Sequence, residues 1–284
     1  MSTNRSWTGI GGGLIDTFLQ TGDVATSGTF TLPPSCKYLV VHMVGAGSGG
    51  GGCVFNTGAS ATGTRHVGGS GGNSGGHWLG VRIPVDYAVT PSYSWIIGAG
   101  GAGGPNATCA LNTPSEQLAT TGVSGVPTEI VGLIKTPYPG HSSYVYHDGA
   151  GAPLPAVYDP LAIGFTDCMS PDVPMFVPEF AGSYWTPNDG GESTNDDGEA
   201  GTSSGVFLGG TGHTGTVSAL HAAGSGGGAS RHGKGGDGSS TTATPAQAGY
   251  GGGGGGAGND STSFTAGTTS GQGGAGILMV EFWG

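Results

Sequence analysis

Two segments of this chain carry the glycine spacing of a dinucleotide-binding loop. Residues 40–50 and 95–103 each place G-x-G-x-x-G directly after an apolar, strand-like stretch. A Rossmann site also needs a helix whose N-terminal amides hold the pyrophosphate, and an acidic residue further on that binds the ribose. Neither glycine run continues as an amphipathic helix, and no acid stands at the expected distance after Gly45. We therefore expect no nucleotide cofactor.

An acidic run and eight histidines are the residues that could bind a metal ion. Residues 188–199 offer carboxylate and amide oxygens of the kind that calcium prefers, but not in the order of an EF-hand. We interpret this run as a solvated polar loop. The histidine pairs His141/His147 and His213/His221 lack metalloprotease spacing. The sequence therefore predicts no metal site and no cofactor of any kind.

Nucleophilic and carboxylate chemistry are the remaining routes to catalysis. Ser225 stands in Ala-Gly-Ser-Gly-Gly without the buried strand that precedes a nucleophile elbow. Carboxylate pairs that cleave glycosides are defined by distance in space, so the sequence leaves a hydrolase open. The candidates share one segment: Asp148, Asp159, Asp167, Asp172 and Glu179. Our prediction is that the chain is not an enzyme.

Glycine is the most frequent residue of the chain, so glycine-rich segments must position any functional site. It accounts for 65 of the 284 residues and occurs in runs such as 49–52, 226–228 and 251–256. An ordered glycine loses more backbone freedom than any other residue. Hydrophobic residues still make up 35% of the chain and cluster in short stretches, which argues against disorder. We predict glycine segments that pack backbone against backbone as polyproline-II-like strands; the alternative is flexible linkers.

Short strand-like segments separate the glycine runs. They are residues 29–32, 37–44, 78–85, 91–97 and 277–283. Helix signals are almost absent, and only residues 12–19 have helix-like spacing. Several short strands at modest spacing are typical of sandwiches and barrels. The expected fold is all-β: a β-sandwich-like core, glycine-rich extended segments, and an insertion rich in proline and aromatic residues.

The insertion spans about residues 126–204, within a glycine-rich β domain of residues 29–284 that follows an N-terminal arm of residues 1–28. Tyrosine and tryptophan give large contact areas at low entropic cost, which suits protein and sugar partners. If the chain contacts a receptor or partner, we expect it there, although the same aromatic residues could form the insertion's own core. The candidates are Tyr138, Tyr144, Tyr146, Tyr158, Tyr184 and Trp185.

Net charge and cysteine content limit the classes of partner and the cellular compartment that we expect for this chain. Seven Lys and Arg against 18 Asp and Glu give a formal charge of −11, which disfavours nucleic acid and anionic membranes. Only 9% of residues are charged, as suits a protein that buries much of itself in an assembly. No secretory signal is visible, so we expect synthesis in a reducing cytosol and free thiols. The thiols are Cys36, Cys53, Cys109 and Cys168.

Four motifs follow one another in an order that resembles a known family. Phe30-Thr-Leu-Pro-Pro leads through an apolar run into Gly45–Gly52. Gly75-Gly-His-Trp-Leu-Gly-Val-Arg-Ile-Pro-Val is the second motif, and Pro91–Gly104 the third. Tyr250 with its glycine run and the final strand close the series. Over most of residues 29–125 and 205–284 the chain resembles the glycine-rich domains of tailed-phage tail fibres and related virion proteins; residues 126–204 depart from the pattern.

The resemblance implies a structural virion protein of a bacteriophage, assembled in the host cytoplasm. We expect a tail fibre, spike or adhesin component that contributes to host recognition; the alternative is a capsid or head decoration protein with a purely structural role. Some relatives are adhesins whose glycine-rich core presents variable loops to a host receptor. The implied partners are other virion proteins, further copies of the chain on a symmetric particle, and a host surface receptor.

The N-terminal arm is the candidate assembly segment. Its apolar residues precede the first strand of the family-like core: Trp7, Ile10, Leu14, Ile15, Phe18 and Leu19. We expect them to dock onto a neighbouring virion protein, and the alternative is that they pack on their own domain.

Overall fold

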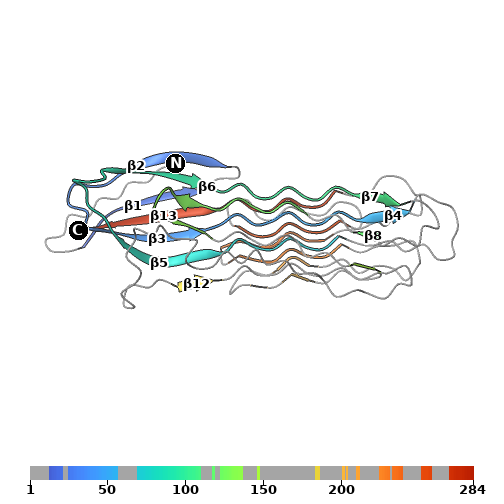
Figure 1. The fold of residues 1–284 in the computed structure, drawn as a ribbon. Coiled ribbons are helices and arrows are strands. Elements are labelled where there is room, and N and C mark those ends of the chain that lie inside the picture. Colours follow the sequence, from blue (N-terminus) through green and yellow to red (C-terminus); the bar gives the residue numbers. More distant parts are fainter. Residues whose placement is uncertain are drawn as a thin grey trace.

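The computed structural model describes part of the chain as strands and extended segments. The described residues are 13–21, 25–56, 69–109, 117–118, 122–136, 146–147, 183–185, 200–201, 203, 209–211, 224–230, 232–238, 251–257 and 269–284. They contain no helix, so the fold is all-β, as the sequence predicts. Figure 1 shows most of the labelled strands at one end of an elongated molecule and glycine-rich segments that run from there to the other end. The short strands β4 (Val54–Asn56), β7 (Ala107–Cys109) and β8 (Gln117–Leu118) lie at that other end.

The largest sheet has five antiparallel strands in the order β1-β13-β3-β5-β12. Their bounds are β1 Leu14–Thr21, β3 Tyr38–Val44, β5 His77–Pro84, β12 Ser183–Trp185 and β13 Ile277–Trp283. Alternate residues of β3 and β13 are buried, so one face of this sheet points into the core and the other points outward. The final strand β13 lies near the centre of the sheet, between β1 and β3.

A second sheet has four antiparallel strands in the order β10-β9-β6-β2. Its strands are β2 Thr26–Thr31, β6 Ser92–Ile97, β9 Glu129–Ile130 and β10 Ile134–Lys135. Two two-stranded pairs complete the described strands: β4 Val54–Asn56 with β7 Ala107–Cys109, and β8 Gln117–Leu118 with β11 Tyr146–His147. The strands predicted from the sequence near 29–32, 37–44, 78–85, 91–97 and 277–283 are therefore confirmed.

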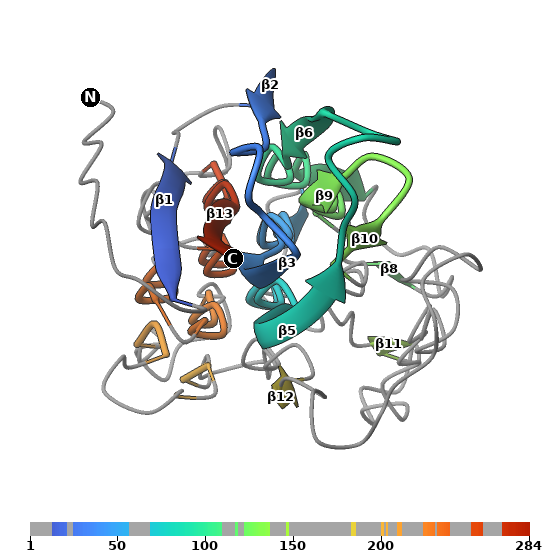
Figure 2. The ribbon, with the colours of Figure 1, turned by 90° about the vertical axis from the view of Figure 1, so that its left-hand side faces the viewer.

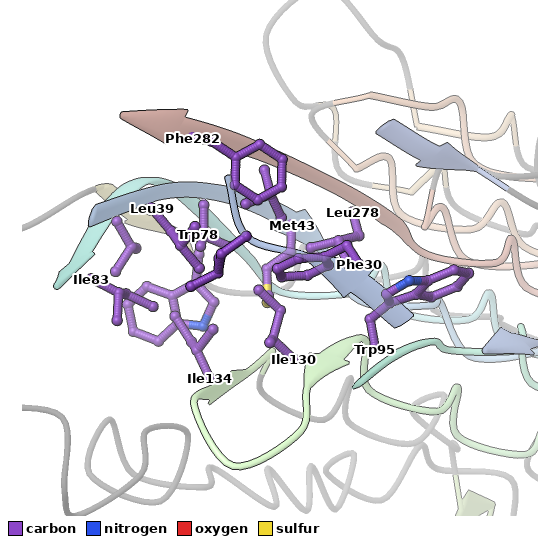
Figure 3. Close-up of a cluster of buried hydrophobic side chains, with 14 of the residues drawn as sticks. Phe30, Leu39, Met43, Trp78, Ile83, Trp95, Ile130, Ile134, Leu278 and Phe282 are labelled. Carbon is purple, nitrogen blue, oxygen red and sulfur yellow. The ribbon is translucent and has the colours of Figure 1, made fainter. Parts of the chain in front are cut away.

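One hydrophobic cluster lies between the five-stranded and four-stranded sheets in a sandwich-like arrangement (Figure 3). Trp78 of β5 is completely buried, and its Nε1 donates a hydrogen bond to the Lys135 carbonyl of β10 at 2.9 Å. Because β5 and β10 belong to different sheets, this bond ties the two layers together. Aromatic rings of both sheets meet in the same cluster, for example Phe30 and Phe282 at 5.5 Å between ring centroids.

Two sequence-based interpretations change with the structure. The helix-like spacing of residues 12–19 is misleading, because Leu14–Thr21 forms β1 and pairs with β13. Pairing with a strand at the far end of the chain decides the conformation here, and local spacing does not show it. Residues 129–135, which composition assigns to the insertion, form β9 and β10 and place Ile130 and Ile134 in the main core.

The glycine runs form hydrogen bonds with a period of three residues. Along residues 45–51, backbone N–H groups point in turn to three different neighbouring segments. The bonds run from Gly45, Ser48 and Gly51 to residues 76, 73 and 70; from Ala46 and Gly49 to residues 126 and 123; and from Gly47 and Gly50 to residues 274 and 271. In the end-on view the glycine segments have triangular outlines, as expected for the three-residue turn of polyproline II (Figure 2).

Carbonyl groups of the same central segment accept from two further segments. Gly101 and Gly104 donate to Gly47 and Gly50, and Gly254 and Ala257 donate to Ser48 and Gly51. Residues 45–51 therefore lie among five neighbouring segments: 69–76, 98–104, 122–126, 251–257 and 271–274. We call this array the glycine bundle. Its backbone groups satisfy one another, as buried amides and carbonyls must, so the predicted backbone-to-backbone packing is correct and the linker alternative is wrong for these residues.

At particular glycines of the bundle, the close approach of a neighbouring segment leaves no room for a side chain. A Cβ added at Gly50 would overlap the carbonyl of Gly255, and one at Gly253 would overlap the carbonyl of Gly72. In both cases the obstacle is backbone, which has no flexible end that could move away. Collagen needs glycine on its axis for the same reason, but here the neighbouring segments all come from one chain.

Candidate functional site

The far end of the glycine bundle is the first candidate, because chain direction brings several connections together there. Residues 45–51 follow β3 and lead away from the sandwich, and residues 98–104 follow β6 in the same direction. Residues 69–76 and 122–128 return toward β5 and β9. Two further segments follow the same pattern. Residues 251–257 run parallel to residues 45–51, away from the sandwich, and residues 269–276 lead back into β13. The described segments before and after the links 57–68, 110–121 and 258–268 therefore all end at this distal end.

Short contacts fix the described ends of these segments to one another. Strands β4 and β7 pair in parallel at the distal end in Figure 1. Just before them, the Asn106 Oδ1 accepts a hydrogen bond from the Cys53 backbone N–H at 3.0 Å. The Ser270 hydroxyl donates to the Gly104 carbonyl at 2.7 Å. These bonds join segments far apart in sequence, so the distal links start from anchored positions.

The links themselves differ in composition from the segments that carry them. Residues 57–68 include Arg65 and His66, residues 110–121 include Leu111 and Glu116, and residues 258–268 include Phe264. Except for Gln117 and Leu118, they lie outside the described residues. The links therefore carry charged and aromatic residues, which are absent from residues 45–51, 69–76 and 251–257.

The structure places the aromatic contact candidates in different parts of the molecule. Tyr146 lies on β11, whose backbone pairs with Leu118 in a distal link. Tyr184 and Trp185 lie on β12, opposite Trp78 and His77 at the edge of the five-stranded sheet. Figure 1 shows β8 and β12 toward opposite ends of the molecule. The described candidates therefore do not form one patch, and the remaining ones lie outside the described residues: Tyr138, Tyr144 and Tyr158.

The candidate assembly residues are divided in a similar way. Phe18 of β1 packs on the protein's own core, with its ring centroid 5.5 Å from that of Phe30 and 5.6 Å from that of Trp95. Ile15 also packs against the core cluster, whereas Leu19 is 53% exposed. Leu14 begins β1 and pairs with Trp283. For Ile15 and Phe18 the structure supports packing on their own domain; Trp7 and Ile10 lie outside the described residues.

A polar and aromatic cluster on the outer face of the five-stranded sheet was not anticipated from the sequence. Tyr38 stacks on Trp283 at 6.0 Å and 11°, and the Arg82 guanidinium lies 3.4 Å from the Tyr38 ring centroid. The Trp283 Nε1 donates to Glu281 Oε2 at 2.9 Å, and Glu281 Oε1 lies 3.8 Å from His42 Nε2. Along residues 38–44 and 277–283, these residues alternate with buried ones. That alternation was the sequence signal that could have revealed the cluster.

The first glycine motif has no backbone donors left to bind a phosphate. Backbone N–H groups of residues 45–51, the first G-x-G-x-x-G run, donate to carbonyls of neighbouring segments. They are therefore not available to hold a pyrophosphate. Within the described residues, no group of three or more His, Cys, Asp or Glu is arranged to hold a metal ion. The acidic run 188–199 and Cys168 lie outside the described residues.

Two of the four cysteines are described as buried free thiols. Cys36 donates a hydrogen bond to the Tyr38 carbonyl at 3.4 Å, and burial raises the pKa of its thiol. A raised pKa keeps this thiol protonated and unreactive at neutral pH. The thiol of Cys53 donates to Asn106 Oδ1 at 3.4 Å and is completely buried. Both residues are therefore part of the packing.

Comparison with known proteins agrees with this architecture. The model of a family described as a glycine-rich domain matches residues 23–283. Because the match spans the sandwich strands β2 to β13 and the glycine bundle, the chain belongs to this glycine-rich domain family. No curated protein matches the sequence. Among the described residues, no helix has the length and apolar character needed to cross a membrane.

Proposed function

We propose that this chain is a non-enzymatic structural virion protein of a bacteriophage, a tail fibre, spike or adhesin component that contributes to recognition of the host. In this proposal the sandwich is the folded base, the glycine bundle is a rigid spacer, and the distal links are the surface that meets the receptor. The particle supplies its other partners, including further copies of the chain.

The observation that carries the proposal is that the described segments flanking residues 57–68, 110–121 and 258–268 all end at one end of the bundle. Backbone contacts require glycine at many positions of the bundle, while the links carry charged and aromatic residues. A rigid scaffold that presents connecting segments at one end is the arrangement that many binding proteins use. Tyr146 pairs with Leu118 of the link 110–121, so its backbone belongs to the same end.

Low charge also supports an assembled, host-facing protein. With 9% charged residues and a formal charge of −11, the chain has little basic surface for nucleic acid or anionic lipid. Contact through tyrosines and hydroxyl-bearing links would depend weakly on salt. In the same proposal, Trp7 and Ile10, which precede β1, attach the base to a neighbouring virion protein.

A capsid or head decoration protein is the second candidate. The density of backbone hydrogen bonds in the glycine bundle favours it, since a purely structural element needs mechanical order and no receptor. A tail protein and a head decoration protein differ in their position on the particle. They also differ in whether changes in the distal links reduce adsorption to the host.

The test is adsorption of phage particles that carry altered distal links. Residues 57–68 and 258–268 are replaced by glycine and serine at equal length. We expect adsorption to fall at least about tenfold, a free-energy change of about 1.4 kcal/mol, while the melting temperature stays the same. A matched control changes Tyr87 and Val89 to Ser. Both are exposed in the β5–β6 connection at the sandwich, and this change is expected to leave adsorption intact.

Three results would contradict the proposal. Mass spectrometry that finds no copy of the chain in purified particles would exclude a virion role. Antibody label on the head, with normal adsorption of the link variants, would favour the decoration protein. Deletion of residues 2–12 tests attachment separately: the chain should fold but fail to enter particles, and normal incorporation would reject the arm as an assembly segment.

A further inference from the structure

The β5 strand contains a bulge beside the edge strand β12. Between Val41 and Met43 the pairing of β3 with β5 shifts register, so that Leu79 and Gly80 together stand opposite His42. Gly80 has a positive φ of 68°, a conformation that residues with a side chain rarely adopt. Bulges of this kind leave one residue outside the regular hydrogen-bond ladder and change the direction of the strand.

The side chain of His42 holds this bulge. Its Nδ1 accepts a hydrogen bond from the Gly80 backbone N–H at 3.3 Å. An imidazole nitrogen can accept only when it carries no proton, so this contact requires the neutral ring with its proton on Nε2. The Nε2 atom is buried without a hydrogen-bond partner, and Glu281 Oε1 is 3.8 Å away.

Protonation would remove this contact. The cationic ring carries hydrogen on both nitrogens, so Nδ1–H would then face the Gly80 N–H, donor against donor. A turn of the ring toward Glu281 would recover some of the lost energy through charge attraction. Among the described charged groups, Glu281 on β13 acts on the ring, whereas Arg82 on β5 lies over the Tyr38 ring; strand β1 contributes Leu19 opposite Met279.

Strand β12 pairs with the three residues directly before Gly80. Ser183, Tyr184 and Trp185 stand opposite Leu79, Trp78 and His77. The pairing of β12 with β5 therefore ends at the bulge. A change in the bulge would alter the part of β5 to which β12 is hydrogen-bonded. With only three residues, β12 has few backbone bonds of its own to resist such a change.

We propose that His42 is a pH-sensitive latch: in its neutral form it holds the β5 bulge so that β12 stays paired, and its protonation in mild acid releases β12 with Tyr184 and Trp185. The latch itself follows from geometry; only a role for the two aromatic residues in host contact rests on the proposed function.

The direction of the pH effect follows from the environment of the ring. Burial lowers the pKa of His42 from its ordinary value of 6.5, and the Glu281 carboxylate raises it less than burial lowers it. The unfolded chain then binds the proton more readily than the folded one. The stability contribution of the neutral ring is complete above pH 6.5 and declines as the pH falls below it.

Hydrogen exchange of the purified full-length protein tests the latch. Amide exchange of residues 183–185 is measured at pH 7.5 and pH 5.0 and corrected for the intrinsic pH dependence of exchange. We expect the corrected rate to be several-fold higher at pH 5.0 than at pH 7.5, because protonation of His42 removes the contact that holds the bulge. In parallel, the amide resonance of Gly80 should shift with a midpoint below 6.5.

Two variants separate the latch from general acid effects. His42→Asn keeps an oxygen acceptor near the position of Nδ1 but does not titrate, so residues 183–185 should exchange slowly at both pH values. His42→Leu lacks the acceptor and should exchange fast at both. The other seven histidines are the same in both variants and in the unaltered protein.

Unchanged exchange of residues 183–185 between the two pH values in the unaltered protein would overturn the proposal. So would a His42→Asn variant that keeps the full pH dependence. If His42→Leu does not fold, the comparison of the unaltered protein with His42→Asn still decides. Because no step uses phage particles or host cells, failure here is distinct from failure of the proposed host recognition.

Discussion

Gly50→Ala is expected to destabilise the protein by more than about 3 kcal/mol, above the usual range for one added methyl group in a packed interior. The new Cβ would overlap the Gly255 carbonyl and come within 2.8 Å of the Gly256 nitrogen. Relief requires that two hydrogen-bonded segments separate, which breaks bonds on both sides of them. For a domain of this size, thermal unfolding should shift down by at least roughly 6 °C.

Gly13→Ala is the matched control for this change. A Cβ at Gly13 meets nothing within 4 Å, and this glycine does not have a positive φ. The same chemical change should therefore alter stability by less than about 0.5 kcal/mol. Equal melting temperatures for Gly50→Ala and the unaltered protein would show that the glycine bundle is looser than described.

Trp78→Ala should cost about 3–5 kcal/mol, the range for removal of a large aromatic side chain from a core. Trp78 is completely buried between the two sheets, and its indole N–H satisfies the Lys135 carbonyl at 2.9 Å. Loss of the ring opens a cavity and leaves that carbonyl without its indole donor. Chemical denaturation monitored by circular dichroism measures the change.

Two further variants resolve the origin of this cost. Trp78→Phe keeps most of the apolar volume but removes the hydrogen bond, so it should cost about 1–3 kcal/mol. Val89→Ala, at a side chain that is 77% exposed, should stay within about 0.5 kcal/mol. A Trp78→Ala protein as stable as the Val89→Ala protein would contradict a core shared by the two sheets.

The sandwich strands could be predicted from sequence because their signals are local. Residues 38–44 and 277–283 are compact apolar runs, and turns such as Pro33-Pro34 separate them from their neighbours. Strand β1 could not be predicted in this way, because its conformation depends on pairing with β13, more than 250 positions away in the chain. The hairpin of β9 and β10 escaped notice for a related reason: each strand has two residues, too few for a period.

Packing of the glycine runs could be inferred, but the arrangement of the bundle could not. Every glycine segment has nearly the same composition, so sequence does not indicate which segments become neighbours. The structure makes residues 45–51 and 251–257 central, since each bonds to several others. The aromatic contact candidates show the same limit, because closeness in sequence placed Tyr146 and Tyr184 in one group and the structure separates β11 from β12.

Amide hydrogen exchange of the glycine segments tests the central claim most directly, because host recognition at the distal links depends on a rigid bundle beneath them. Amides with a bonded partner in the bundle, such as Gly47, Gly50 and Gly254, should be protected as strongly as those of the core strands β3 and β13. Protection comparable to Val41 and Val280 is the predicted result. Exchange of these glycines at the rate of an unstructured linker, while β3 and β13 remain protected, would contradict the account.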